Sequence, residues 1–227
     1  MNKLLSLTLV LVVGYSAHAQ KLILQPQVGI RNFEFQSGET FPQVTTLSTS
    51  PSAGARLIYQ SKKGHGPYLG FHVNSLIVNK NFGTLNQSTN YTLTTYEAGY
   101  QWMSKPVYFK RIWDNNLSRA DFESLPKKGW AIQFNPNVGI SYTRPLHQYY
   151  NTAVMTLTGV AGLNAGMGFI FSKNGKQLFS LVVNYTKGIT GDLYYSNRPF
   201  SAAPYISTKG SGFNIGIGVP INLLKKK

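Results

Sequence analysis

The acidic residue Glu97 is the most informative chemical group in this chain, because it lies in a segment where apolar and polar residues alternate. His72, Arg31 and Arg56 occupy the polar phase of other segments of the same kind. A carboxylate beside an imidazole could act in acid–base catalysis. A carboxylate beside guanidinium groups would instead form an interior ion-pair network, because a buried carboxylate needs a cationic partner. We favour the network and include in it Gln101, which shares the polar phase of Glu97.

A hydrolase site is a second possibility for the chemistry of this chain. His147 lies near Ser141 and Thr143, and Asp192 is the acidic residue of the last two long connections. Sequence distance does not exclude a triad, because a triad is recognised by its geometry. However, no acidic residue is placed to orient His147, and no His, Asp and Glu residues have metal-ligand spacing. The glycine run 162–168 lacks the strand-to-helix context of a nucleotide site. We therefore expect no catalytic residue, metal or cofactor.

Alternation with period two marks the elements that must position these side chains. Over 213–223 every odd position is apolar and every even position is polar, glycine or proline, which is typical of a strand with one apolar face. Eight segments share this pattern: 22–35, 52–60, 68–78, 91–108, 130–143, 159–171, 178–187 and 213–223. They predict an all-β fold, an eight-stranded antiparallel transmembrane β-barrel of the outer membrane with polar residues facing the lumen.

The first 19 residues have the pattern of a secretory signal peptide. Lys3 precedes an apolar run over 4–13, and Ala17-His18-Ala19 supplies a small-residue cleavage site. The run is too short for a membrane-spanning helix, which needs about 20 residues. We therefore expect a mature chain that forms one β-barrel domain, 20–227. The chain contains no cysteine, so no disulfide framework is possible.

The connections between the expected strands alternate in length. Tight turns are expected at 62–66 and 173–176, and longer connections, rich in Ser, Thr, Asn and Pro, near 37–51, 79–90, 144–157 and 188–208. Outer-membrane barrels have short periplasmic turns and longer outer loops, so this pattern predicts that both termini are periplasmic.

The segment 110–128 is an unusually long connection at the expected periplasmic end. It could be a solvated flap over the mouth of the barrel or a docking surface for a protein partner. The residues that could contact a partner are Trp113, Asp114, Asp121, Phe122 and Glu123.

The charge of the chain is unevenly distributed. The net charge is +15, and most of the basic residues fall at the expected periplasmic end: Lys21, Lys62, Lys63, Lys105, Lys110, Arg111, Arg119, Lys127, Lys128, Lys173, Lys176, Lys225, Lys226 and Lys227. A basic ring there suits the anionic headgroups of outer-membrane lipid. Nucleic acid is not an expected partner, because the chain is exported and its charges are dispersed over turns.

Aromatic residues predict two belts at the level of the lipid headgroups. The inner belt would contain Tyr59, Tyr68, Trp102 and Trp130. The outer belt would contain Tyr91, Tyr142, Tyr149, Tyr150, Tyr194 and Tyr195. An exposed recognition cluster is the alternative for the last four residues.

The leader ending Ala17-His18-Ala19-Gln20, the glycine-rich alternating strands and the closing segment 212–221 together resemble the PorT-like outer-membrane β-barrel proteins of Bacteroidota. The resemblance covers essentially the whole mature chain and is architectural, with no catalytic signature to transfer. It implies a structural, accessory or assembly role. Unlike many proteobacterial barrels, this chain ends Asn222-Leu-Leu-Lys-Lys-Lys227, without a terminal aromatic residue.

Three functions are compatible with such a barrel. We expect a non-enzymatic structural or accessory subunit of an envelope complex, with an envelope protein as partner. The alternatives are a small-solute or adhesin-type surface barrel and a lipid-modifying barrel enzyme. Eight strands leave an interior that side chains can fill, which disfavours an open pore. A soluble, lipocalin-like barrel is the alternative fold, and it would need an apolar interior and a polar exterior.

Overall fold

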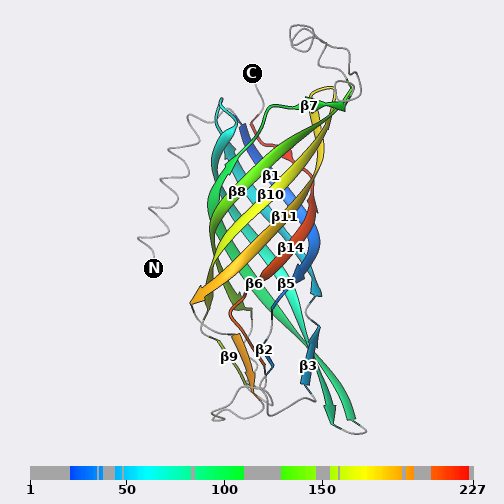
Figure 1. Ribbon diagram of the computed structural model, residues 1–227, viewed down its shortest axis with the longest axis vertical. Coiled ribbons are helices and arrows are strands. Elements are labelled where there is room, and N and C mark those ends of the chain that lie inside the picture. Colours follow the sequence, from blue (N-terminus) through cyan, green and yellow to red (C-terminus); the bar gives the residue numbers. More distant parts are fainter. Residues whose placement is uncertain are drawn as a thin grey trace.

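The computed structural model is a closed antiparallel β-barrel (Figure 1). It describes residues 21–34, 36–37, 44–47, 49–82, 85–109, 129–146, 154–157, 159–190, 193–196 and 206–224. Eight strands form the wall: β1 (Lys21–Asn32), β4 (Thr49–Gln60), β5 (His65–Phe82), β6 (Leu85–Trp102), β8 (Trp130–Pro145), β10 (Val160–Lys173), β11 (Lys176–Thr190) and β14 (Gly212–Gly218). Each strand pairs with the next in this order, and β14 pairs with β1 to close the wall.

Short strands extend the wall at both ends. Near the tight turns, β7 (Val107–Tyr108) pairs with β8 and β15 (Ile221–Asn222) pairs with β1. At the opposite end β3 (Val44–Leu47) pairs with β5. A separate four-stranded sheet at that end consists of β2 (Gln36–Ser37), β13 (Ile206–Thr208), β12 (Leu193–Ser196) and β9 (Val154–Leu157). The described part of the chain contains no helix long and apolar enough to cross a membrane.

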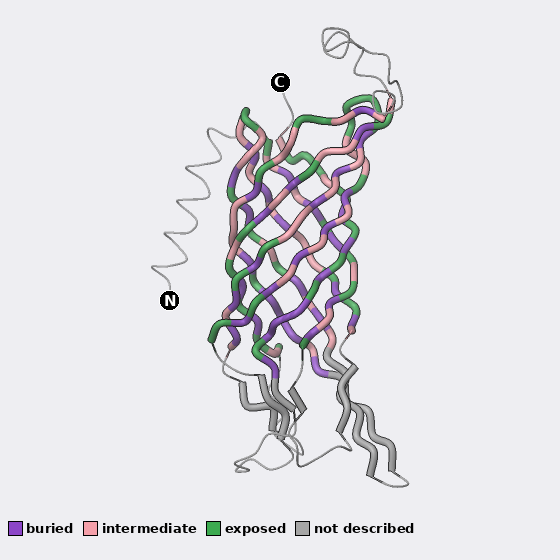
Figure 2. Tube along the Cα trace, in the orientation of Figure 1, coloured by how far each residue is buried: buried purple, intermediate pink, exposed green. Residues whose placement is uncertain are grey.

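Buried and exposed residues alternate along the wall strands (Figure 2). On β14, for example, Phe213 and Ile215 are exposed, whereas Asn214 between them is buried. Polar and charged residues outnumber apolar ones among the buried side chains of the described residues. This arrangement is the reverse of a soluble, lipocalin-like barrel and matches a barrel whose outer face contacts lipid.

The structure confirms all eight expected strands, and the two tight turns are present. Asn174 and Gly175 both have positive φ values, 52° and 78°, as a two-residue hairpin turn of type I′ requires. Gly64, with a φ of 83°, lies in the other turn.

The largest differences from the expected strand boundaries are three. The segment 79–90 was expected to be a loop, but β5 and β6 continue through it to a hairpin that pairs Phe82 with Leu85. The residues of this segment are mostly polar, so the sequence lacks the apolar–polar alternation from which a strand is predicted. The fourth strand ends at Trp102 rather than near Tyr108. The chain resumes as β7 only after Pro106, which has no N–H to donate to a ladder. The closing strand is interrupted at Pro220, which has no N–H to donate.

Two residues assigned to the aromatic belts point into the lumen instead. Tyr68 and Tyr91 are 1% and 2% exposed, whereas Trp102 and Trp130 are 45% and 42% exposed. The physical reason is that every second side chain of a strand points to the same face. Tyr68 therefore points to the same side as His72, and Tyr91 to the same side as Glu97, which is the lumen. Tyr142, 45% exposed, lies on the outer face as expected.

Several predictions concern parts of the chain outside the described residues. These are the signal peptide 1–19, the connection 110–128 with Trp113, Asp114, Asp121, Phe122 and Glu123, and the residues His147, Tyr149, Tyr150 and Asp192. The side chains of Tyr194 and Tyr195 on β12 are also outside the described set.

A charge on the outer face should destabilise the barrel according to its depth. Val138, in the middle of β8, is 48% exposed, and Leu223, beyond the end of β15, is also 48% exposed. We expect Val138→Arg to lower the free energy of unfolding by about 2–4 kcal/mol and Leu223→Arg by about 0–1 kcal/mol. Urea titration in phospholipid vesicles measures both. Equal losses would contradict the assignment of this face to lipid.

Candidate functional site in the barrel lumen

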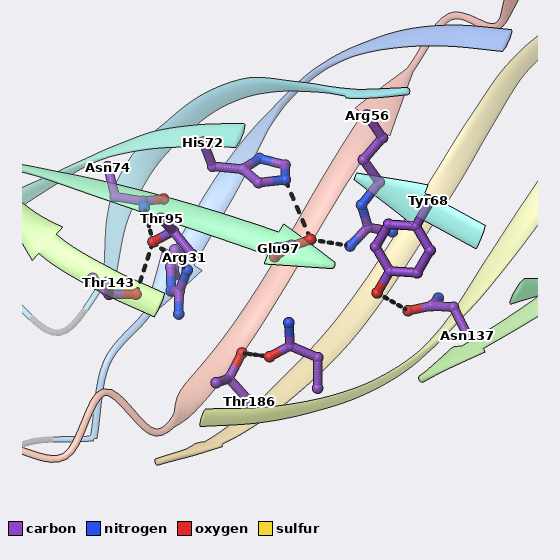
Figure 3. A network of polar contacts seen from close by, with 11 residues as sticks. Arg31, Arg56, Tyr68, His72, Asn74, Thr95, Glu97, Asn137, Thr143 and Thr186 are labelled. Carbon is purple, nitrogen blue, oxygen red and sulfur yellow. Dashed lines mark hydrogen bonds and ion pairs between the residues drawn. The ribbon is translucent and has the colours of Figure 1, made fainter. Parts of the chain in front are cut away.

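An ion pair bridges two strands of the lumen. An Nη atom of Arg56, on β4, lies 2.7 Å from a carboxylate oxygen of Glu97, on β6, and both side chains are almost fully buried (Figure 3). The strand β5 separates them, and its residue in register with both is Gly70. A Cβ atom at Gly70 would lie 3.2 Å from the Glu97 side chain. The glycine therefore leaves room for the ion pair to pass over the intervening strand.

Tyr68 packs against this ion pair from the same strand as Gly70. Its ring lies beneath the Arg56 guanidinium, 4.7 Å from centroid to Cζ, in cation–π geometry. Its hydroxyl donates to the side-chain amide oxygen of Asn137 at 3.4 Å. A Cβ atom at Gly99 would lie 2.7 Å from the ring. Gly99 and its cross-strand partner Gly139 thus provide the space that the ring fills.

His72 lies on the other side of Glu97. Its Nε2 atom is 3.6 Å from the same carboxylate oxygen that binds Arg56, which is longer than a hydrogen bond. An acid–base role would require both groups to reach a substrate. Instead, Glu97 is bonded to Arg56, and the His72 and Glu97 side chains are 2% and 3% exposed. The geometry is that of an interior network and offers a substrate no access to either group.

Arg31 belongs to a second cluster, nearer the end of the barrel that carries the four-stranded sheet. Its Nη1 atom donates to the Thr95 hydroxyl at 3.0 Å, and the Asn74 amide donates to the same oxygen at 3.1 Å. The hydroxyls of Thr95 and Thr143 are 2.9 Å apart. The guanidinium also lies over the Phe33 ring, at 4.8 Å. Arg31 therefore reaches from β1 to β6 across the lumen (Figure 3).

Gln101 belongs to a third layer, nearer the tight turns. It accepts a hydrogen bond from the Asn135 amide at 3.1 Å. In the same layer the Gln25 amide donates to the hydroxyl of Ser180. A small cavity of about 10 Å³ adjoins Gln25, Gln101 and Met103. This volume is about that of one water molecule, too small for an organic ligand.

The network proposed from the sequence is thus divided among three layers. Arg56, His72 and Glu97 come together, whereas Arg31 and Gln101 have other partners. Sequence reasoning missed Tyr68, Asn74, Thr95 and Asn137, although strand parity was a signal that could have found them. Ser141 and Thr143 are both buried in the lumen. The described residues include no group of three His, Cys, Asp or Glu side chains that could hold a metal ion.

Comparisons with known proteins support the fold. The chain is similar to the outer membrane protein OprG from Pseudomonas aeruginosa in its crystal structure, with a TM-score of 0.56 and 13% sequence identity over 90% of this chain and 97% of that chain. No family model matches the chain, and no curated protein matches it. At this identity the likeness shows the fold alone: an eight-stranded barrel of the outer-membrane type.

Breaking the central ion pair should be costly. Glu97→Gln leaves the Arg56 charge buried without its carboxylate, and removing one partner of a buried pair typically costs about 3–5 kcal/mol. We expect the double variant Arg56→Gln, Glu97→Gln to lose less, because no unpaired charge remains. Urea unfolding in vesicles, followed by tryptophan fluorescence, measures these changes.

The matched control is Glu34→Gln at the exposed rim, where the carboxylate accepts a hydrogen bond from Tyr185 at 3.3 Å. This change should stay within about 0.5 kcal/mol. The account of the network fails if Glu97→Gln is as mild as Glu34→Gln.

Proposed function

We propose that this chain is a non-enzymatic outer-membrane β-barrel that acts as a structural or accessory subunit of an envelope complex. The observation that supports it best is the central crossing of the lumen by Arg56, Glu97 and Tyr68. A barrel whose interior is occupied by its own side chains offers no wide aqueous path, which argues against a general pore. Its remaining functional surfaces are then its ends and its outer wall.

The proposed orientation places both termini in the periplasm. In support, the beginning of β1 and the end of β15 lie at the same end as the two tight turns (Figure 1). The described lysines at this end are exposed: Lys21, Lys62, Lys63, Lys105, Lys173 and Lys176. Their charge would attract the anionic headgroups of the inner leaflet of the outer membrane. Outer-membrane lipid is therefore a proposed partner at this rim.

A non-enzymatic role is supported by the state of the candidate acid–base pair. Glu97 is bonded to Arg56, and His72 is buried beside it. The closing strand and the lumen-facing glycines are also consistent with kinship to the PorT-like barrels of Bacteroidota. That kinship is part of the proposal, as is an accessory role of the kind that the resemblance implies.

Affinity purification of the tagged full-length protein from native outer membranes in mild detergent tests this function. We expect a stoichiometric envelope protein to co-purify with the barrel. Replacing Asp114, Asp121 and Glu123 in the connection 110–128 by their amides should release this partner. The control variant Lys62→Gln, Lys63→Gln changes charge in a turn at the same end and should retain it. A lone monomer in mild detergent would contradict the accessory role.

A further inference from the structure

The charges inside the barrel do not balance. Among the described residues the buried arginine and acidic side chains are Arg31, Arg56 and Glu97. The carboxylate of Glu97 lies 2.7 Å from Arg56, so that pair is neutral. The charge of Arg31 remains, on a residue that is 1% exposed. A buried charge is very unfavourable unless it is paired or solvated.

The contacts of Arg31 do not neutralise it. Its Nη1 atom donates to a neutral hydroxyl, that of Thr95, and its Nη2 atom is buried without a hydrogen-bond partner among the described groups. The Phe33 ring contributes only a cation–π contact. The other acidic residue among those described, Glu34, is exposed and accepts from Tyr185. None of these groups supplies a negative charge to the Nη2 atom.

Further donors occupy the same part of the wall. The strand register places Asn214 beside Arg31 and Asn184 beside Asn214. Both polar atoms of the Asn184 side chain, its amide nitrogen and its amide oxygen, are buried without a partner, so the nitrogen is free to donate to an anion. On the next strand, the side-chain oxygen of Asn164 accepts from the Thr186 hydroxyl at 2.8 Å, and the side-chain nitrogen of Asn164 is also without a partner. A cation and neutral N–H donors thus face the lumen from three of four consecutive strands, β1, β11 and β10.

We propose that the lumen binds one small inorganic monoanion, such as chloride, at the Nη2 atom of Arg31, with the amides of Asn164 and Asn184 as additional donors. Water could satisfy these N–H groups, but it would not neutralise the guanidinium. A single negative charge would make the buried lumen neutral. The anion is then part of the folded barrel, and this inference is independent of the proposed accessory role.

Bromide, a heavier substitute for chloride, locates the site directly. Crystals of the wild-type barrel grown in sodium bromide should give an anomalous peak at hydrogen-bond distance from Nη2 of Arg31. Water alone at this position, or a carboxylate of Glu39 or Asp192, would overturn the proposal.

A stability measurement provides an independent test. At constant ionic strength, replacing gluconate by chloride should raise the thermal midpoint of the wild-type barrel with the logarithm of chloride concentration, because a ligand stabilises the state that binds it. Arg31→Gln should abolish this dependence. Arg144→Gln removes a positive charge from an exposed residue over the Tyr96 ring and should leave the dependence unchanged. Equal chloride dependence in all three proteins would contradict the site. If Arg31→Gln does not fold, the bromide experiment on the wild-type protein decides.

Discussion

Closure of the wall is the constraint on which the rest of this structure depends. Lipid offers no partner for backbone N–H and C=O groups, so a sheet that crosses a membrane must pair its last strand with its first. Here β14 pairs with β1. A wall of only eight strands encloses a space that side chains can fill. The outer face must then be apolar, and the polar and charged residues are confined to a narrow interior where each must find a partner.

Glycines make this interior possible. The Arg56–Glu97 pair crosses β5 at Gly70, and the Tyr68 ring occupies the space left by Gly99 and Gly139. Large lumen residues on one strand therefore face glycines on its neighbours, and a Cβ atom at those glycines would approach the large side chains closely. The glycine-rich strands of the sequence thus have a packing role, and the Arg56–Glu97 pair and the Tyr68 ring occupy the lumen where these glycines leave room.

The sequence predicts the wall well and the interior only partly. Period-two alternation is a property of each strand alone, so eight strands and their faces could be read from it; the extension of β5 and β6 through 79–90 has no apolar face and could not. Parity also places Arg56, His72 and Glu97 in the lumen. Their separation from Arg31 and Gln101 depends on the stagger between strands, which sequence alone does not give. Tyr68 was expected in the lipid belt because it is an aromatic residue near a strand end. Its position in the alternation places it in the lumen, and the structure shows it there.

Single-channel recording in a planar bilayer tests the central claim, closure of the lumen by the Arg56–Glu97 pair, most directly. The account predicts that the purified wild-type barrel inserts without a steady conductance, whereas Glu97→Ala together with Tyr68→Ala, which removes the crossing and its ring, produces one. A steady wild-type conductance that is unaffected by these two substitutions would contradict it.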